Sequence, residues 1–237
     1  MFISALLGCG PTQVGPSPSA RSLEVALARD VLAVGESERA IARLHDGSVA
    51  RDVPADWVST DAAIVAIDQA GAIASRSVGQ VEIRAKYQDL EAARQLAVVT
   101  SFAGVWRGRV ATVSCQRESG PGPNACRFIL HGEHPIAVDI RQHGSQISGT
   151  LAMFQDAVSG VLNVGVKART ATIVRPLILT SAKQTATVTA LTMTLDGPAL
   201  RIEELQVRRE DINGWGRQVY LETYQMTAPL SAQPEAN

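Results

Sequence analysis

The residues with the clearest potential for chemistry are the metal-ligand types in the stretch His131-Gly132-Glu133-His134. A zinc-binding helix of the H-E-x-x-H kind places both histidines on one helical face. Here a glycine stands inside the motif and Pro135 follows it, so the pattern indicates a loop. We expect these polar side chains to be solvated, with a metal site as the less favoured alternative, and we expect no cofactor.

Carboxylate pairs, the second candidate chemistry, occur at Glu203-Glu204 and at Glu210-Asp211. Neighbouring side chains of a strand point to opposite faces, so neither pair forms an acid–base couple without help from the tertiary structure. By the same argument, Arg208-Arg209 is expected at a solvated strand edge. The sequence contains neither a G-x-S-x-G nucleophile elbow nor a glycine-rich phosphate loop. These observations predict a protein that is not an enzyme.

The N-terminus resembles a signal sequence that directs a protein to a membrane. Residues 1–8 are apolar and small, and with the next residue they contain Leu6-Leu7-Gly8-Cys9, which resembles the lipobox of bacterial lipoproteins. The resemblance implies that residues 1–8 are the remnant of a cleaved signal and that the Cys9 sulfur carries a diacylglycerol. Each buried methylene of such a lipid contributes about 0.8 kcal/mol to membrane binding. Because no Lys or Arg precedes the run, an accidental apolar terminus with a free cysteine is the alternative.

Residues 9–21 are rich in proline, glycine and serine. Such a segment cannot bury enough apolar surface to fold. We therefore expect a flexible tether behind the lipidated cysteine, which would span about 35 Å if extended as polyproline. The membrane is then a partner through the lipid anchor. The expected location is the bacterial cell envelope, periplasmic or at the cell surface, with the outer membrane favoured.

The chain contains three cysteines. If Cys9 is lipidated, Cys115 and Cys126 remain as a pair, and they flank a run of turn residues. A disulfide between them would contribute about 2–4 kcal/mol by constraining the unfolded chain. It would also require an oxidising compartment. Metal binding is the alternative, but the pair lacks a second pair of ligands at a suitable spacing.

Length and composition set broader limits. The chain has 237 residues, enough for two modest domains, with a formal net charge of −1 and 4% aromatic residues. It contains no basic stripe with interleaved aromatic residues, so nucleic acid is not expected as a partner. The low aromatic content also weakens the case for a face that stacks sugar rings.

Short apolar runs separated by turn residues fill residues 22–100. Val81, Ile83 and Ala85 alternate with polar residues, which indicates a strand with one buried face. Asp46-Gly47 is a hairpin signal, because glycine accepts a positive φ at little cost. Several short strands with frequent turns predict a β-sandwich.

The same segment resembles the group 2 bacterial immunoglobulin-like domain. The matching features are an opening Val-Gly, two turns, a tryptophan before a polar turn and a closing strand, found at Val34-Gly35, Asp46-Gly47-Ser48, Trp57 to Asp61, Val65 to Asp68 with Gly71, and Gly79 to Tyr87. The resemblance implies a two-sheet sandwich with Trp57 buried and without an active site. Modules of this family are spacers and adhesive units of cell envelopes.

Beyond residue 100 the pattern stays β and the strands lengthen. Ile136, Val138 and Ile140 alternate with polar residues, and Asp196-Gly197 is a further hairpin signal. We expect a meander of about eight to ten strands, which has exposed edges unless it closes into an up-and-down barrel. Gly104-Val105-Trp106 resembles the G-x-W start of lipocalin-like and avidin-like barrels, in which the Trp plugs the closed end.

The expected fold is therefore all-β. An Ig-like β-sandwich at residues 22–100 is followed by an antiparallel meander at residues 101–230, in the form of a lipocalin-like β-barrel. Residues 231–237 are expected to form a disordered tail.

The predicted function is that of a non-enzymatic cell-envelope lipoprotein, whose Ig-like module presents a barrel-like binding domain to an envelope protein or a glycan. The alternative is a lipocalin-like carrier of a small apolar ligand. The side chains expected to line its cavity are Trp106, Val110, Ile136, Val138 and Ile140. Trp215, which stands between two glycines, is a candidate surface contact, although such a Trp more often folds back onto a barrel.

Overall fold

The computed structural model describes residues 21–153, 158–174, 176–180, 184–213 and 216–233. Among them the only helix is α1 (Cys126–Ile129), and the other regular elements are strands. The expected all-β class is therefore confirmed. The described helix is too short to cross a membrane. The expected signal remnant, Cys9 and all of the tether except Arg21 lie outside the described residues.

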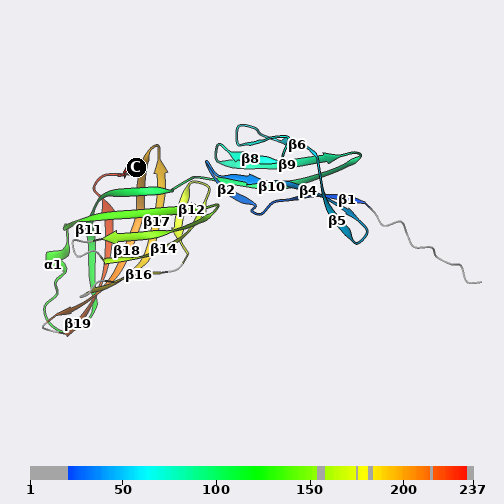
Figure 1. Cartoon of the computed structure of the whole chain (residues 1–237). Helices are drawn as coiled ribbons and strands as arrows, with labels where there is room; N and C mark the ends of the chain where they lie inside the picture. Colours follow the sequence, from blue (N-terminus) through cyan, green and yellow to red (C-terminus); the bar gives the residue numbers. More distant parts are fainter. Residues whose placement is uncertain (1–20, 154–157, 175, 181–183, 214–215, 234–237) are drawn as a thin grey trace, which may run out of the picture.

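The N-terminal unit, residues 21–99, contains ten strands, which are β1 (Ser22–Ala26), β2 (Val31–Ala33), β3 (Ser37–Arg39), β4 (Ile41–Asp46), β5 (Val49–Val53), β6 (Asp56–Ser59), β7 (Val65–Ile67), β8 (Ala72–Ser75), β9 (Gly79–Tyr87) and β10 (Leu90–Val99). They form three sheets in the orders β1-β4-β5, β2-β10-β9-β6 and β3-β8-β7. Their inner faces pack around one apolar core, which includes Leu32, Val65, Ile73, Ile83 and Leu96. This arrangement is a β-sandwich, as expected, although its strands form three sheets rather than the two that the resemblance implied (Figure 1).

Trp57 occupies a different position from the one expected. The side chain is only partly buried, and it packs against the edge of the apolar core rather than at its centre. Gly71, which has a φ of +79°, lets the indole approach closely, because a Cβ there would lie 3.3 Å from two ring atoms. The expectation of a fully buried Trp57 is therefore wrong, and the core is filled by smaller aliphatic side chains.

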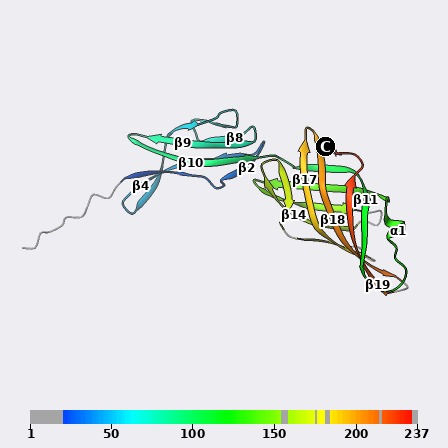
Figure 2. The ribbon, with the colours of Figure 1, turned by 180° about the vertical axis from the view of Figure 1, so that it is seen from behind.

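The second unit, called the barrel below, spans residues 104–233. Its strands are β11 (Gly104–Ser119), β12 (Glu133–His143), β13 (Gln146–Met153), β14 (Val158–Lys167), β15 (Thr170–Ile173), β16 (Leu177–Thr180), β17 (Gln184–Asp196), β18 (Ala199–Asn213), β19 (Gly216–Met226) and β20 (Leu230–Gln233). Neighbouring strands pair in an antiparallel manner, and the pairings β11–β19 and β14–β15 complete a ring. The expected meander thus closes into a barrel (Figures 1 and 2).

Two positions in the ring are each shared by two strands. β15 and β16 both lie between β14 and β17, while β19 and β20 both lie between β11 and β18. Pro176 precedes β16 and Pro229 precedes β20, and a proline cannot donate to the ladder. Residues 231–233 belong to β20 and pair with β11, so the expectation that they form part of a disordered tail is wrong. The remaining residues of that expected tail, 234–237, lie outside the described residues.

The two ends of the barrel differ. The proximal end, where β11 begins, faces the N-terminal unit, and the distal end, which carries α1 and the start of β19, points away from it (Figures 1 and 2). Trp106 lies towards the proximal end, where its indole N–H donates to the carbonyl of Phe102 at 2.9 Å. Both side chains are buried, so the proximal end is filled at this point, as the G-x-W pattern predicted.

Candidate functional site

The distal half of the barrel contains a cluster of inward-facing polar side chains, which we call the distal cluster: His134, Arg209, Asp211, Glu222 and Tyr224. They come from β12, β18 and β19, which are brought together when β11 pairs with β12 on one side and β19 on the other. Alternation along each strand decides which side chains face inward.

A β-bulge in β18 decides which arginine joins the distal cluster. Thr192 pairs with Glu204 and Met193 pairs with Ile202, so Glu203 is an extra residue in β18. An extra residue shifts every later side chain to the opposite face. Leu200 and Ile202 are buried before the bulge, whereas Leu205 and Val207 are buried after it, and Arg209 continues this inward-facing series.

Arg209 and Glu222 form a buried ion pair. The Nε and Nη2 groups of Arg209 donate to Oε1 of Glu222 at 3.0 and 2.9 Å, and Nη1 donates to Asp211. The Glu222 side chain is completely buried and that of Arg209 is 12% exposed. Burial lowers the pKa of the Arg209 guanidinium, but the charge and hydrogen bonds of Glu222 together with the charge of Asp211 outweigh burial, so the pKa lies above its ordinary value. The guanidinium therefore stays charged.

The second oxygen of Glu222 is also engaged. The Tyr224 hydroxyl donates to Oε2 of Glu222 within the barrel. Burial raises the pKa of the Tyr224 phenol well above 10.0, and the charge of Glu222 raises it further, so the hydroxyl remains a donor. Both carboxylate oxygens of Glu222 therefore have a hydrogen-bond partner, Arg209 at Oε1 and Tyr224 at Oε2. A buried ion requires such partners.

His134 points into the barrel beside Tyr224. The two rings meet edge to face with their centroids 6.0 Å apart. Burial lowers the pKa of His134, and Arg209 and Arg109 lower it further, while Glu222 acts in the opposite direction. The imidazole is therefore neutral near pH 7.

The stretch His131-Gly132-Glu133-His134 is only partly the loop that the sequence indicated. Glu133 and His134 begin β12, with Glu133 on the outer face, where it pairs with Arg109 at 2.8 Å. His134 faces inward, so the expectation that it is solvated is wrong. No group of three or more potential metal ligands occurs among the described residues.

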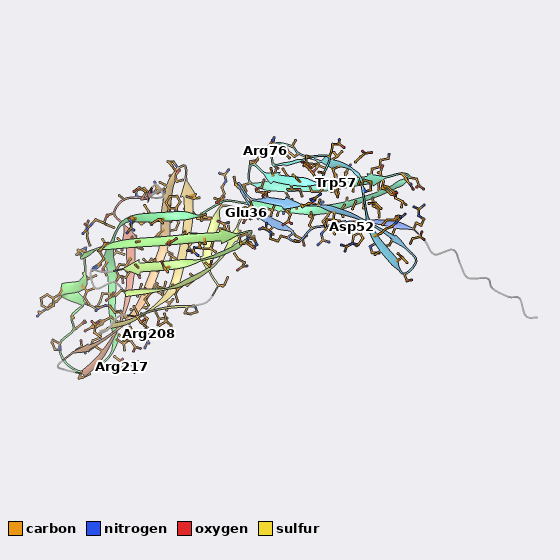
Figure 3. The ribbon with its side chains drawn as sticks, in the orientation of Figure 1. Glu36, Asp52, Trp57, Arg76, Arg208 and Arg217 are labelled. Atoms are coloured by element: carbon orange, nitrogen blue, oxygen red, sulfur yellow. A yellow bond between two sulfur atoms is a disulfide. The ribbon has the colours of Figure 1, made fainter. Side chains whose placement is uncertain are left out.

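An outer ion-pair network lies on the opposite face of the same strands. Arg208 contacts Glu118 at 2.6 Å and Glu210 at 3.1 Å, and Arg217 contacts Glu210 at 2.5 Å. Arg208 and Arg217 are both near the distal end (Figure 3). Neighbouring charged residues of β18 do point to opposite faces, as expected, and Arg208 is solvated as expected. The same expectation is wrong for Arg209, which is inside the barrel.

The expected disulfide between Cys115 and Cys126 is confirmed. Cys115 pairs directly with Glu222 in the β11–β19 ladder, so the disulfide lies beside the distal cluster. The enclosed loop is held further by Gln218, whose side-chain amide donates to the carbonyl of Pro121, and by Arg117, which donates to Gly122 at 2.6 Å. The loop is thus fastened to the distal end at several points.

Phe128 is an exposed aromatic residue next to this loop. Its side chain, on α1, is 74% exposed, and the Arg127 guanidinium lies 4.5 Å from the centre of its ring. The sequence analysis did not single out Phe128. An aromatic residue two positions after Cys126, just beyond the turn residues that separate the two cysteines, was the signal available. Trp215, the contact residue that the sequence did single out, lies outside the described residues.

The side chains expected to line a ligand cavity are all buried in the barrel core. They are Trp106, Val110, Ile136, Val138 and Ile140. Val110, Val138 and several described neighbours on other strands are completely inaccessible to water, namely Leu151, Leu179, Val188, Leu191, Leu205 and Val207. A cavity large enough for a ligand would expose the side chains that line it. Around these residues, therefore, the interior is filled by side chains at the close packing usual in protein cores.

The distal cluster also escaped the sequence analysis, although one signal for it was present. Tyr220, Glu222 and Tyr224 alternate along the last long strand, with an acidic residue between two aromatic residues on one face. In a barrel, such a face is either solvated or contains a buried polar network. Only the partner strands, with Arg209 on β18, decide between these outcomes.

Comparisons with known proteins leave the function open. No family model and no curated protein matches the chain. Among solved structures, the chain is similar to the zebrafish ileal bile acid-binding protein complexed with cholic acid, with 16% identity over 53% of this chain and 98% of that chain, at a TM-score of 0.23. A score this low supports no argument, so the fold assignment depends on the strand pairings described above.

Replacing Arg209 tests the buried ion pair. Arg209→Leu should lower the free energy of unfolding by about 3–5 kcal/mol, because it leaves Glu222 as an uncompensated buried charge. The double variant with Glu222→Leu should recover much of that loss, since the isolated charge is then gone. Urea denaturation followed by fluorescence measures both effects.

Arg208→Leu is the matched control for this experiment. It removes a neighbouring arginine from the solvated face of the same strand, where ion pairs contribute little. Equal losses for Arg208→Leu and Arg209→Leu would contradict the inward position of Arg209.

The lowered pKa of His134 predicts a pH-dependent stability. The ordinary value of 6.5 applies to the unfolded chain, so below about that pH the unfolded state binds a proton that the folded state excludes. Stability should therefore decrease as the pH falls through this region, and His134→Gln should remove that part of the decrease. Melting temperatures measured between about pH 7.5 and about pH 5.5 test this. His131→Gln, an exposed position in the same segment, is the control, and identical pH profiles for wild type and His134→Gln would refute the assignment.

Proposed function

We propose that the chain is a non-enzymatic protein of the bacterial cell envelope, in which an Ig-like spacer presents the distal end of a barrel to a partner. The lipobox-like sequence before Cys9 and the turn-rich segment after it support a lipid anchor with a tether. The disulfide between Cys115 and Cys126 supports an oxidising compartment such as the periplasm or the cell surface.

The observation on which this proposal chiefly depends is the close packing of the described side chains in the middle of the barrel. Water-inaccessible side chains occupy its described middle, and Trp106 is buried near its proximal end. A barrel of this kind acts through its surface rather than by enclosing a ligand. The distal end is the surface farthest from the N-terminal unit, and it carries the disulfide-held loop and Phe128 (Figure 1).

Phe128 is the side chain that we assign to partner contact at this end. Exposed aromatic residues and arginines are enriched among the residues that dominate binding energies. Phe128 and Arg127 are held next to the disulfide, so little conformational freedom remains to be lost on binding. An envelope protein and a glycan are the classes of partner we propose for this surface.

A native mass spectrum of the chain purified from an oxidising bacterial periplasm separates this function from that of a carrier. We expect the mass of the polypeptide with one disulfide and no small molecule, because the described side chains in the middle of the barrel are packed without accessible space between them. A spectrum of the denatured protein is the control. Additional mass that disappears on denaturation would instead support a carrier of a small apolar ligand.

Membrane fractionation tests the anchor. The wild-type chain should sediment with membranes, whereas Cys9→Ser should appear in the soluble fraction, because the acyl chains supply the membrane affinity. Cys126→Ser is the matched control, since it removes a thiol that takes part only in the disulfide and should leave the chain with the membranes. Membrane association of Cys9→Ser at the wild-type level would rule out lipidation at this residue.

A further inference from the structure

A carboxylate of the N-terminal unit binds a turn of the barrel. Glu36 lies between β2 and β3, and both of its carboxylate oxygens accept the backbone N–H of Gly144, each at 3.1 Å. The same carboxylate accepts the N–H of Ala33 at 2.8 Å and contacts Arg29 at 3.1 Å. Glu36 lies at the junction of the two units in Figure 3. Charge-assisted hydrogen bonds of this kind are about twice as strong as neutral ones.

The turn that Glu36 binds fits closely against β2. Gly144 has a φ of +57°, and a Cβ at this position would lie only 2.5 Å from the carbonyl oxygen of Val31. Only glycine lets the two backbones approach this closely. The β12–β13 hairpin of the barrel is thus docked directly on the N-terminal unit.

The connection between the units is fastened to the barrel as well. The N–H of Thr100 donates to the carbonyl of Ala168 at 2.8 Å. The Gln142 side chain accepts the N–H of Phe102 at 2.6 Å and donates to the carbonyls of Thr100 and Gly144 at 2.9 Å. Thr100 and Phe102, two residues of the connection, are thus held to the barrel through both their N–H and carbonyl groups.

Apolar packing continues across the same junction. Ala33 and Val99, from the ends of β2 and β10, and Phe102 from the connection belong to the apolar core of the barrel, and Val31 packs against it. Interfaces between domains are usually polar, and relative motion is the default expectation. Here the N-terminal unit instead completes the core at the proximal end.

We infer that the N-terminal unit and the barrel move as one rigid body, joined by a latch in which Glu36 binds the Gly144 turn. The latch holds the distal end in one direction relative to the N-terminal unit. The inference goes beyond the proposed function, because it concerns residues 21–233 alone and holds whether or not Cys9 is lipidated.

Nuclear spin relaxation of the full chain carrying Cys9→Ser tests the latch. Backbone amides of both units should report one shared rotational correlation time in the otherwise wild-type protein. Gly144→Ala should abolish this common value, because the new Cβ collides with Val31 and separates the units. Each unit should then tumble faster than the intact body.

The chain contains a matched control for the glycine. Gly197 has a φ of +59° in the β17–β18 turn, but a Cβ there would meet nothing within 4 Å. Gly197→Ala therefore introduces at least as much backbone strain as Gly144→Ala, because residue 197 also precedes Pro198, but the new Cβ has no neighbour in the N-terminal unit. We expect Gly197→Ala to retain the shared correlation time.

A second pair of variants keeps the test informative if Gly144→Ala does not fold. Glu36→Gln removes the charge of the latch, whereas Glu38→Gln removes a carboxylate that contacts Arg29 within the N-terminal unit. Only Glu36→Gln should weaken the coupling between the units. The inference would be overturned if the two units of the protein carrying only Cys9→Ser had different correlation times. It would also be overturned if Gly144→Ala behaved like Gly197→Ala and Glu36→Gln behaved like Glu38→Gln.

Discussion

The pairing of β11 with β19 is the contact on which the other features of the barrel depend. It joins the first and last long strands of a meander, so it removes the free edges that an open sheet of this length would expose. The same ladder places Cys115 opposite Glu222 and Thr112 opposite Tyr224. Closure therefore also creates the setting of the distal cluster and of the disulfide-held loop. These contacts are distant in sequence, and they form only when the whole ring is in register.

Within this ring, strand register determines the chemistry of each face. The bulge at Glu203 turns Arg209 inward and leaves Arg208 outside. One arginine becomes part of a buried ion pair, and its neighbour contributes to a solvated network. A buried ion pair is weak evidence for stability, because desolvation costs roughly what the attraction returns. In this barrel its clearest effect is to specify register, because a slip of one residue would leave Glu222 buried without its partner.

The proximal and distal ends have different physical characters. The proximal end is apolar and is completed by residues of the N-terminal unit, with Gly144 docked against Val31. The distal end is polar inside, and outside it carries an exposed aromatic residue next to the disulfide.

Features that depend on short-range patterns could be predicted from the amino-acid sequence. Alternation of apolar and polar residues, as at Ile136, Val138 and Ile140, indicated strands with one buried face, and these side chains are in the core. Asp-Gly turns placed hairpins, and the Cys115–Cys126 pairing followed from cysteine content and the turn-rich segment between the two residues. The G-x-W pattern located the buried Trp106.

Features that depend on a partner far along the chain could not be predicted in this way, because long-range contacts set them. The inward position of Arg209 requires the bulge against β17, and that of His134 requires β12 to begin earlier than the loop-like motif indicated. Residues 231–233 form a strand because β11 offers an edge there, not because their own composition favours one. Side-chain period alone cannot say which face of a strand is inside when one inserted residue reverses both faces.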